Sequence, residues 1–259
     1  MINLNISSTN YQNRFPYPHC AIENALENDF ALKCQEEILQ IPDSEWDRYN
    51  NPFEQKYTLR DKNNFPKHCQ QLFNLLTSEE IVQKLSNIVG EPLFNDPTKN
   101  WWGIHKYDDG DHLDIHSDAG IHPVTEDKKH VTLGIYLSKD WKEENKGHLE
   151  IWNGDSVTNN DAKLTMLHTK ILPTFNKLVL FNNTNNAWHG NPTPVSIKNN
   201  EKRIFVTLSY LSKKHDNGYE NIRKKAFFVK LPDEADNPEK DKLRLLRADP
   251  EKYKEIYSI

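Results

Sequence analysis

The sequence contains no long hydrophobic run. Its apolar stretches fall far short of the roughly 20 residues that a membrane-spanning helix needs. The first residues, Met1 to Ser7, also lack the basic and apolar regions of a secretory signal peptide. We therefore expect a soluble, cytoplasmic protein with no membrane partner.

Cysteine and nucleotide-binding motifs are scarce as well. Cys20, Cys34 and Cys69 form an odd, scattered set without metal-type spacing, which is typical of a reducing compartment. The sequence has no internal repeat, no Gly-x-Gly-x-x-Gly motif and no phosphate-binding loop. A formal net charge of −5 gives no reason to expect a nucleic-acid partner. The oligomeric state stays open.

Helical patterns dominate the first hundred residues. Apolar residues recur at helical spacing from Asp29 to Ile41, where Pro42 ends the run. Pro66 opens a second helix, and the capping-box spacing of Thr77-Ser-Glu-Glu80 precedes a third that stops at Gly90. Residues 46–60 show no clear period. We expect these helices to form a packing layer.

From Trp101 onward the sequence changes to short aromatic or β-branched runs that polar connections separate. We expect strands at Trp101–Tyr107, Val131–Leu137, His148–Trp152, Leu164–Thr169, Leu178–Phe181 and Arg203–Leu211. Short strands that follow helices predict an α+β fold, a barrel or sandwich with helices on one side. We expect one domain, 1–259, with a helical part at about 1–100, a β core at about 101–211 and a helical tail at about 212–259. In the tail, Asp249-Pro250 predicts a break between two short helices that pack on the core or cover it.

A candidate metal site lies at His116-Ser117-Asp118. In an extended strand, residues two apart point to one face, so this imidazole and carboxylate could reach one metal ion. Two histidines and one carboxylate with open positions are typical of non-haem Fe(II) oxygenases. The pair His112 and Asp114 has the same spacing and strand parity, so spacing alone does not exclude it.

The second histidine of such a site is best supplied by His189, which follows the apolar strand that ends at Phe181. His148 and His168 are alternative candidates for this second histidine on the basis of residue type alone. Fourteen residues after His189, Arg203 opens a strand, and a buried guanidinium needs an anionic partner. A dicarboxylate that chelates a metal through one end would offer that partner through the other.

Seven short motifs follow one another between Trp101 and Leu211. They are Tyr107-x-x-Gly110, His116-x-Asp118, Thr132-Leu-Gly-Ile-Tyr-Leu137 followed by Trp141, Gly147-x-Leu-Glu-Ile-Trp152, Pro173-x-Phe-Asn-Lys-Leu-Val-Leu-Phe181, Trp188-His-Gly-x-Pro192 and Arg203. In this order, they resemble the 2-oxoglutarate- and Fe(II)-dependent oxygenases, specifically the prolyl 4-hydroxylase-like branch.

The resemblance implies a double-stranded β-helix of the jelly-roll or cupin type, with the N-terminal helices packed on one sheet. It implies His116, Asp118 and His189 as metal ligands and catalytic residues. It also implies co-substrate binding by three residues: Arg203 at the distal carboxylate, Thr132, and Tyr107 near the metal and substrate. Fe(II), 2-oxoglutarate and O2 are the implied cofactors, and ascorbate is left open as a further reductant. The implied reaction hydroxylates an unactivated C–H bond and releases succinate and CO2.

The chain departs from the family pattern at several positions. Leu113 stands where prolyl hydroxylases usually carry a second tyrosine that serves the co-substrate carboxylate, and Gly147-His-Leu-Glu150 replaces the usual Gly-Gly-Glu. Lys202 is an alternative to Arg203, although strand alternation would point it to the opposite face. Related halogenases carry Gly or Ala in place of the carboxylate, so Asp118 favours hydroxylation or a related oxidation.

The substrate and two other functions stay open. A peptidyl side chain, such as that of proline, and a small molecule are both compatible with the resemblance. The alternatives are a non-catalytic ligand-binding module of the same fold and a zinc-dependent hydrolase, although no HExxH motif is present. Among other residues near the motifs, we expect Trp101, Trp102 and Trp188 to pack in the core. We expect Lys128–His130 and Arg223–Lys225 to be solvated.

Overall fold

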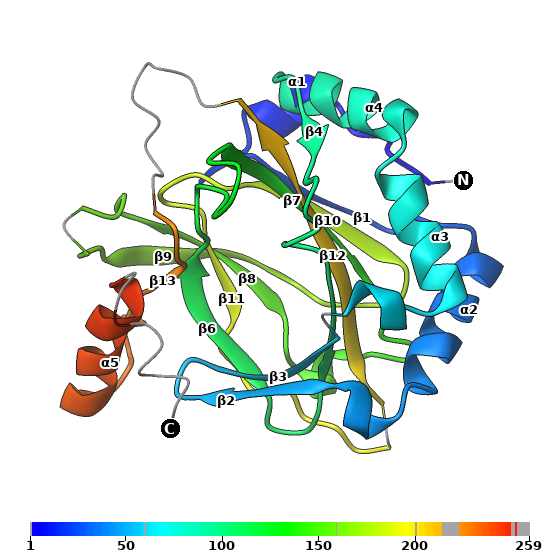
Figure 1. Cartoon of the computed structure of the whole chain (residues 1–259). Helices are drawn as coiled ribbons and strands as arrows, with labels where there is room; N and C mark the ends of the chain where they lie inside the picture. Colours follow the sequence, from blue (N-terminus) through cyan, green and yellow to red (C-terminus); the bar gives the residue numbers. More distant parts are fainter. Residues whose placement is uncertain are drawn as a thin grey trace.

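A curled sheet of antiparallel strands forms the centre of the computed structural model, with helices on its outer side (Figure 1). The structure describes residues 2–59, 61–158, 160–199, 201–213, 223–249 and 252. The helices are α1 (Ser8–Gln12), α2 (Asn28–Leu39), α3 (Lys67–Leu76), α4 (Glu79–Val89) and α5 (Pro238–Ala248). Among the described residues, no helix has the length and apolar character needed to cross a membrane.

Thirteen strands make up the sheet. They are β1 (His19–Ile22), β2 (Asp47–Asn51), β3 (Glu54–Leu59), β4 (Phe94–Asn95), β5 (Gly103–Tyr107), β6 (His112–Ser117), β7 (Lys128–Tyr136), β8 (Leu149–Gly154), β9 (Leu164–Ile171), β10 (Lys177–Asn182), β11 (Trp188–Asn191), β12 (Arg203–Ser212) and β13 (Phe227–Phe228). Their main order is β1-β10-β7-β12-β5-β3-β6-β11-β8-β9. This nearly closed, antiparallel arrangement is the predicted double-stranded β-helix.

The alternation of side chains along β7 separates the core from the interior of the barrel. Val131, Leu133 and Ile135 are fully buried in the largest hydrophobic cluster, which also holds apolar side chains of α2, α3 and α4. Thr132 and Tyr136 leave the strand on the other face and line a cavity inside the barrel. Each fully buried Leu or Ile contributes about 1.5–3 kcal/mol. The side chains on one face of β7 thus pack against the helical layer, and those on the other face line the cavity.

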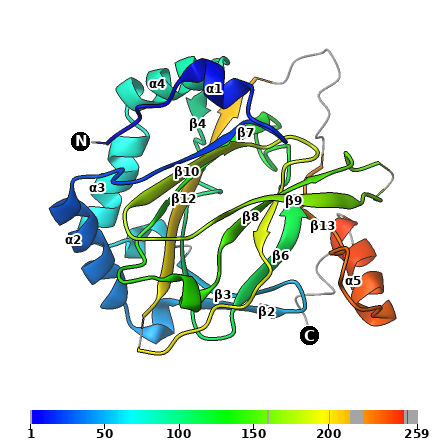
Figure 2. The ribbon, with the colours of Figure 1, turned by 180° about the vertical axis from the view of Figure 1, so that it is seen from behind.

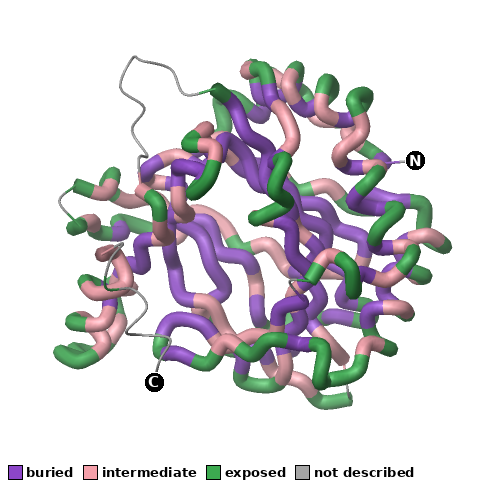
Figure 3. Tube along the Cα trace, in the orientation of Figure 1, coloured by how far each residue is buried: buried purple, intermediate pink, exposed green. Residues whose placement is uncertain are grey.

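The predicted N-terminal helices are confirmed and lie together on one flank of the barrel, opposite α5 (Figures 1 and 2). Gly90 ends α4 in the left-handed conformation, with φ of 83°, as expected of a helix stop. Ser78, and not Thr77, caps the start of α4, because the Thr77 hydroxyl donates to the Phe73 carbonyl at the end of α3. Figure 3 shows the burial of the central strands beneath this layer.

Residues 47–59 form a hairpin that the sequence did not reveal. β2 pairs with β3, and β3 in turn pairs with β5 and β6. Lys56 and Thr58 of β3 face the cavity, so polar side chains occupy the inward positions. The strand therefore lacks the alternation that marks an apolar core face.

The predicted first helix of the tail is α5, which Asn237 caps. Ion pairs hold it to the barrel: Lys240 Nζ lies 2.8 Å from Asp114 Oδ2, and Arg247 lies 3.7 Å from Glu54 of β3. The predicted second helix, after Asp249-Pro250, lies outside the described residues.

Candidate metal centre and co-substrate pocket

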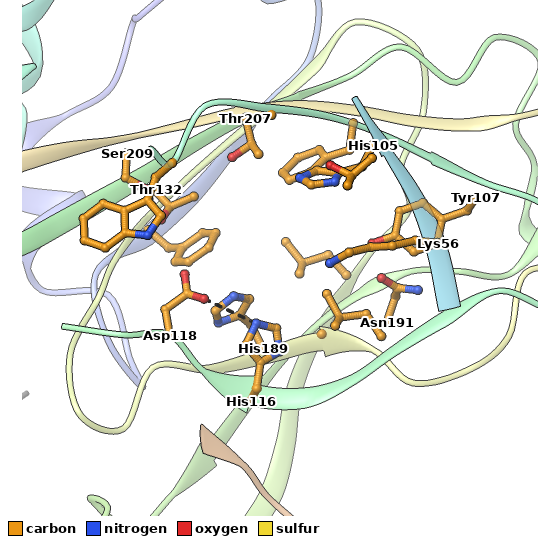
Figure 4. Close-up of a pocket in the computed structure, with 18 of the residues that line it drawn as sticks. Lys56, His105, Tyr107, His116, Asp118, Thr132, His189, Asn191, Thr207 and Ser209 are labelled. Atoms are coloured by element: carbon orange, nitrogen blue, oxygen red, sulfur yellow. Dashed lines mark hydrogen bonds and ion pairs between the residues drawn. The ribbon is translucent and has the colours of Figure 1, made fainter. Parts of the chain in front are cut away.

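Strands β6 and β11 bring two histidines and one carboxylate together. His116 lies directly opposite His189 in the antiparallel pair, and their ring centroids are 4.5 Å apart. Asp118, just after β6, places Oδ1 3.4 Å from His116 Nε2. One ligand atom from each residue lies within 4.8 Å of the others. Figure 4 shows the three side chains gathered at one end of the cavity. Within the described ranges, no other group of His, Cys, Asp and Glu meets this condition.

Hydrogen bonds fix the orientation of both imidazole rings, so that each Nε2 is directed to the common point between the three ligand residues. His116 Nδ1 lies 3.0 Å from the Asp114 carbonyl, and His189 Nδ1 lies 2.8 Å from the Ala187 carbonyl. A carbonyl oxygen only accepts, so each Nδ1 carries the proton and each neutral ring keeps its Nε2 lone pair free. Such bonds to the second nitrogen typically orient metal-ligating histidines.

The pKa shifts of His189 and Asp118 suit a divalent cation. Burial, followed by the neighbouring His116, lowers the pKa of His189 to about 3, which keeps that ring neutral. Burial alone would raise the pKa of the Asp118 carboxyl, but the neighbouring Lys129 ammonium holds it well below its ordinary value. Neutral imidazoles and an ionised carboxylate are the donor set that Fe(II) takes in facial triads. The residues present therefore fit an iron ion.

Lys129 holds the second oxygen of Asp118. Its Nζ lies 2.7 Å from Oδ2, and 8% of the Lys129 side chain is exposed. Because Oδ2 faces the ammonium group and Oδ1 faces His116, the carboxylate presents one oxygen to the common point. Arg223 fixes the adjoining backbone, since its Nη2 lies 2.8 Å from Ser117 Oγ and 3.0 Å from the Asp118 carbonyl. The expectation that both basic clusters are solvated was thus wrong for Lys129 and Arg223.

The variant Lys129→Met should lower the iron affinity of the protein about tenfold, the lower end of what loss of an outer-shell partner costs. The Asp118 carboxylate would lose the group that fixes its orientation, while an unbranched side chain would still fill the space. Competition with a chelator measures the iron affinity, and Lys128→Met is the matched control. An iron affinity equal to that of the wild type would show that Lys129 does not position the carboxylate.

The rival pair His112 and Asp114 does not join the site. His189 is opposite His116 but Asn191 is opposite Leu113, so β6 contains one extra residue between these positions. Such a bulge breaks the alternation of side chains, and Leu113 and His116 both line the cavity as a result. In a regular strand both pairs would point to the same face, so spacing alone does not separate them.

The other two candidate histidines have different partners. His148 Nε2 lies 2.9 Å from Glu143 Oε2. The ring of His168 packs edge-on against Phe15, with centroids 5.5 Å apart. Neither residue belongs to the cluster that contains His116, Asp118 and His189.

Arg203 enters the same cavity, which has a volume of about 380 Å³, from the start of β12. The residue is 2% exposed, and its guanidinium lies over the Tyr107 ring at 4.5 Å. Its Nε donates to the Gly147 carbonyl at 2.8 Å, and Nη2 lies 3.5 Å from the Tyr136 hydroxyl. Among the described residues, no carboxylate pairs with it. A buried guanidinium without an acidic partner fits the distal carboxylate of a dicarboxylate ligand.

The neighbours of Arg203 agree with this role. Gly147 has φ of +63°, and a Cβ there would stand 3.2 Å from Arg203 Cδ, so glycine leaves room for the arginine. Burial raises the pKa of Tyr136 to about 12, which keeps its phenol protonated. Lys202 points away, with Nζ 2.6 Å from Asp108 Oδ1. Thr132 lines the cavity, and its Oγ1 lies 3.1 Å from Ser209 Oγ.

The three tryptophans divide between the cavity and the core. Trp101 and Trp102 line the cavity, although Trp102 also stacks on Phe73 of the helical layer, with centroids 4.8 Å apart. Trp188 is fully buried beside Phe227 and donates from Nε1 to the Asp155 carbonyl. The expectation of core packing holds for Trp188 and in part for Trp102.

Further cavity residues went unnoticed in the sequence: Tyr49, Lys56, Thr58, His105 and Asn191. Most come from the missed hairpin or from β5, where only the three-dimensional pairing shows which face is inward. Asn191 could have been found, because it lies two residues after His189 on the same strand and therefore on the same face.

Two histidines and one carboxylate beside open space, as found here at the cavity that also holds Arg203, are typical of mononuclear non-haem iron oxygenases. A family model described as the 2OG-Fe(II) oxygenase superfamily matches residues 102–212, the β core. The β core of this chain is thus similar to the 2OG-Fe(II) oxygenases, an enzyme family that uses Fe(II), 2-oxoglutarate and O2. A comparison with curated protein sequences gives no match.

Solved structures agree on the fold. A prolyl hydroxylase from Trichoplax adhaerens, in complex with a hypoxia-inducible-factor peptide fragment, has a TM-score of 0.60 at 16% identity, over 80% of this chain and 88% of that one. The epimerase SnoN from nogalamycin biosynthesis has a TM-score of 0.57 at 12% identity, over 89% and 90%. A Pseudomonas putida prolyl-4-hydroxylase has a TM-score of 0.53 at 12% identity, over 80% and 97%. At these identities the likeness shows the fold, the double-stranded β-helix.

Proposed function

We propose that this chain is a 2-oxoglutarate-dependent hydroxylase whose iron is held by His116, Asp118 and His189. One observation carries the proposal: two features line the same cavity. They are three ligand atoms within 4.8 Å of one another and a buried arginine that has no acidic partner among the described residues. A metal site alone would equally suit a hydrolase. The arginine adds a reason for a dicarboxylate.

The co-substrate subsite consists of Arg203, Thr132 and Tyr107. Arg203 binds the distal carboxylate of 2-oxoglutarate through nitrogens that the Gly147 carbonyl leaves free. The aromatic ring of Tyr107 packs against the Arg203 guanidinium. Thr132, which also lines the cavity, offers a hydroxyl group. When bound, Fe(II) and 2-oxoglutarate supply, together with O2, the oxidising power for hydroxylation of an unactivated C–H bond, with succinate and CO2 as co-products.

The remaining cavity receives the prime substrate. The β2–β3 hairpin supplies Tyr49, Lys56 and Thr58 as one wall, and Arg247 of α5 reaches an adjoining hollow beside Lys56 and His116. A peptidyl side chain, proline included, or a small molecule can enter this space. The peptide in the Trichoplax structure supports the first and the antibiotic-biosynthesis enzyme the second. Helical layer, β core and tail act together as one oxygenase domain.

The test measures succinate release while peptides and metabolites are supplied one at a time with Fe(II), 2-oxoglutarate and O2, with and without ascorbate. The Asp118→Ala protein is the control. Substrate-stimulated succinate release that needs iron and Asp118 supports the proposal. Turnover with zinc in the absence of 2-oxoglutarate would replace it with a hydrolase, and a folded protein that binds neither metal nor 2-oxoglutarate would favour a binding module.

A further inference from the structure

Asn191 is a buried residue of the cavity wall with an unused hydrogen-bond donor. It is 2% exposed, and its Nδ2 lacks a hydrogen-bond partner among the described residues. Figure 4 shows its side chain at the cavity, across from Asp118. Nearly all buried polar groups in proteins are paired, so an unpaired buried amide needs an explanation. A ligand with an acceptor oxygen supplies one.

The neighbours of Asn191 place it at the Arg203 end of the cavity. Across the β6–β11 pair it is opposite Leu113, and Leu113 packs with Tyr107 and Val195. Tyr107 lies beneath the Arg203 guanidinium, and a Cβ on Gly147 would meet both Val195 and Arg203. Asn191 and Arg203 therefore flank one hydrophobic cluster.

The distance from the metal ligands also fits. Asn191 follows His189 by two positions on β11, which corresponds to about 7 Å along an extended strand. This is comparable to the length of a five-carbon dicarboxylate. A co-substrate that chelates iron through its oxo-acid end would thus bring its distal carboxylate close to Asn191.

The chemistry of this end of the cavity favours an anion. Asp118 is the only acidic residue among the described residues that line the cavity, and it lies at the metal end. Leu113, opposite Asn191, offers no polar group. Of this pair of residues, the Asn191 amide is therefore the one that can donate a hydrogen bond to an anion in the cavity.

We propose that Asn191 is a co-substrate-binding residue whose Nδ2 donates a hydrogen bond to the distal carboxylate of 2-oxoglutarate, beside Arg203. This inference rests on the proposed function, because it presupposes that 2-oxoglutarate binds in this cavity. It gives β11 a second role besides holding His189, because Asn191 lies two residues further along the same strand.

Ligand binding tests the inference without turnover. Calorimetric titration of the Mn(II)-loaded protein compares 2-oxoglutarate with 2-oxovalerate, which has the same chain length but lacks the distal carboxylate. In Asn191→Leu, which removes the donor at similar volume, the affinity for 2-oxoglutarate should fall about tenfold and that for 2-oxovalerate should stay unchanged. Asn191→Asp keeps the shape and adds a negative charge, so its loss for 2-oxoglutarate should be larger.

Each other outcome overturns the inference in a distinct way. Wild-type affinity for 2-oxoglutarate in folded Asn191→Leu and Asn191→Asp proteins would show that the amide does not bind it. An equal loss for both ligands would place the amide away from the distal carboxylate. If the metal-loaded wild type bound no 2-oxoglutarate at all, the proposed function itself would fail, whatever the variants did.

Discussion

The His189→Ala protein should fold normally and bind iron more than about 100-fold more weakly than the wild type. That loss exceeds the 10- to 100-fold range that follows removal of an outer-shell partner, because a ligand itself is lost. His189 supplies one of three atoms that lie within 4.8 Å of one another, and the two that remain form an incomplete site. Iron-dependent turnover should disappear with the metal. Chelator competition measures the affinity, and circular dichroism checks the fold.

A matched histidine on the same sheet sharpens this test. His112→Ala removes the same side chain from β6, where it lies 3.7 Å from Asp114 and outside the triad. We expect iron affinity in this variant to stay within about twofold of the wild type, since outer-shell effects start near tenfold. Loss of iron from His112→Ala, with retention in His116→Ala, would prove that the wrong His-x-Asp pair has been chosen.

The second large effect concerns Arg203→Ala, which should raise the 2-oxoglutarate concentration for half-saturation on the order of 100- to 4,000-fold. Removing one partner of a buried ion pair costs about 3–5 kcal/mol, because the other charge stays buried without compensation. Arg203 is 2% exposed, so solvent does not replace it. Steady-state succinate release over a range of 2-oxoglutarate concentrations measures the shift.

Lys202→Ala is the control for charge. Its partner Asp108 has 36% of its side chain exposed, and such surface pairs contribute about 0–1 kcal/mol. We expect a change of less than about fivefold in the 2-oxoglutarate requirement. A larger effect from Lys202 than from Arg203 would mean that the neighbouring lysine serves the co-substrate.

The predictable parts of the fold have a local physical signal. The amphipathic spacing of α2, α3 and α4 reflects burial against a single cluster, and the Gly90 stop reflects a φ that other residues rarely adopt. His116, Asp118 and His189 came together as expected, because strand alternation and the order of motifs along the chain both led to them.

The parts that sequence reasoning missed depend on pairing between distant segments. The bulge that separates His112 from His116 forms only where β6 meets β11. Lys129 looks like a solvated residue until the chain returns beside Asp118, where the Lys129 amide bonds to the Gly120 carbonyl. The β2–β3 hairpin faces a polar cavity, so its inward side chains carry no apolar period.

The most direct test of the account uses anaerobic protein, Fe(II) and 2-oxoglutarate. Chelation of iron by the oxo acid gives a visible charge-transfer band, which requires the metal site and the co-substrate site at once. We expect the band in the wild type and its absence in His189→Ala. A folded, iron-loaded wild type that shows no band on addition of 2-oxoglutarate would contradict the account.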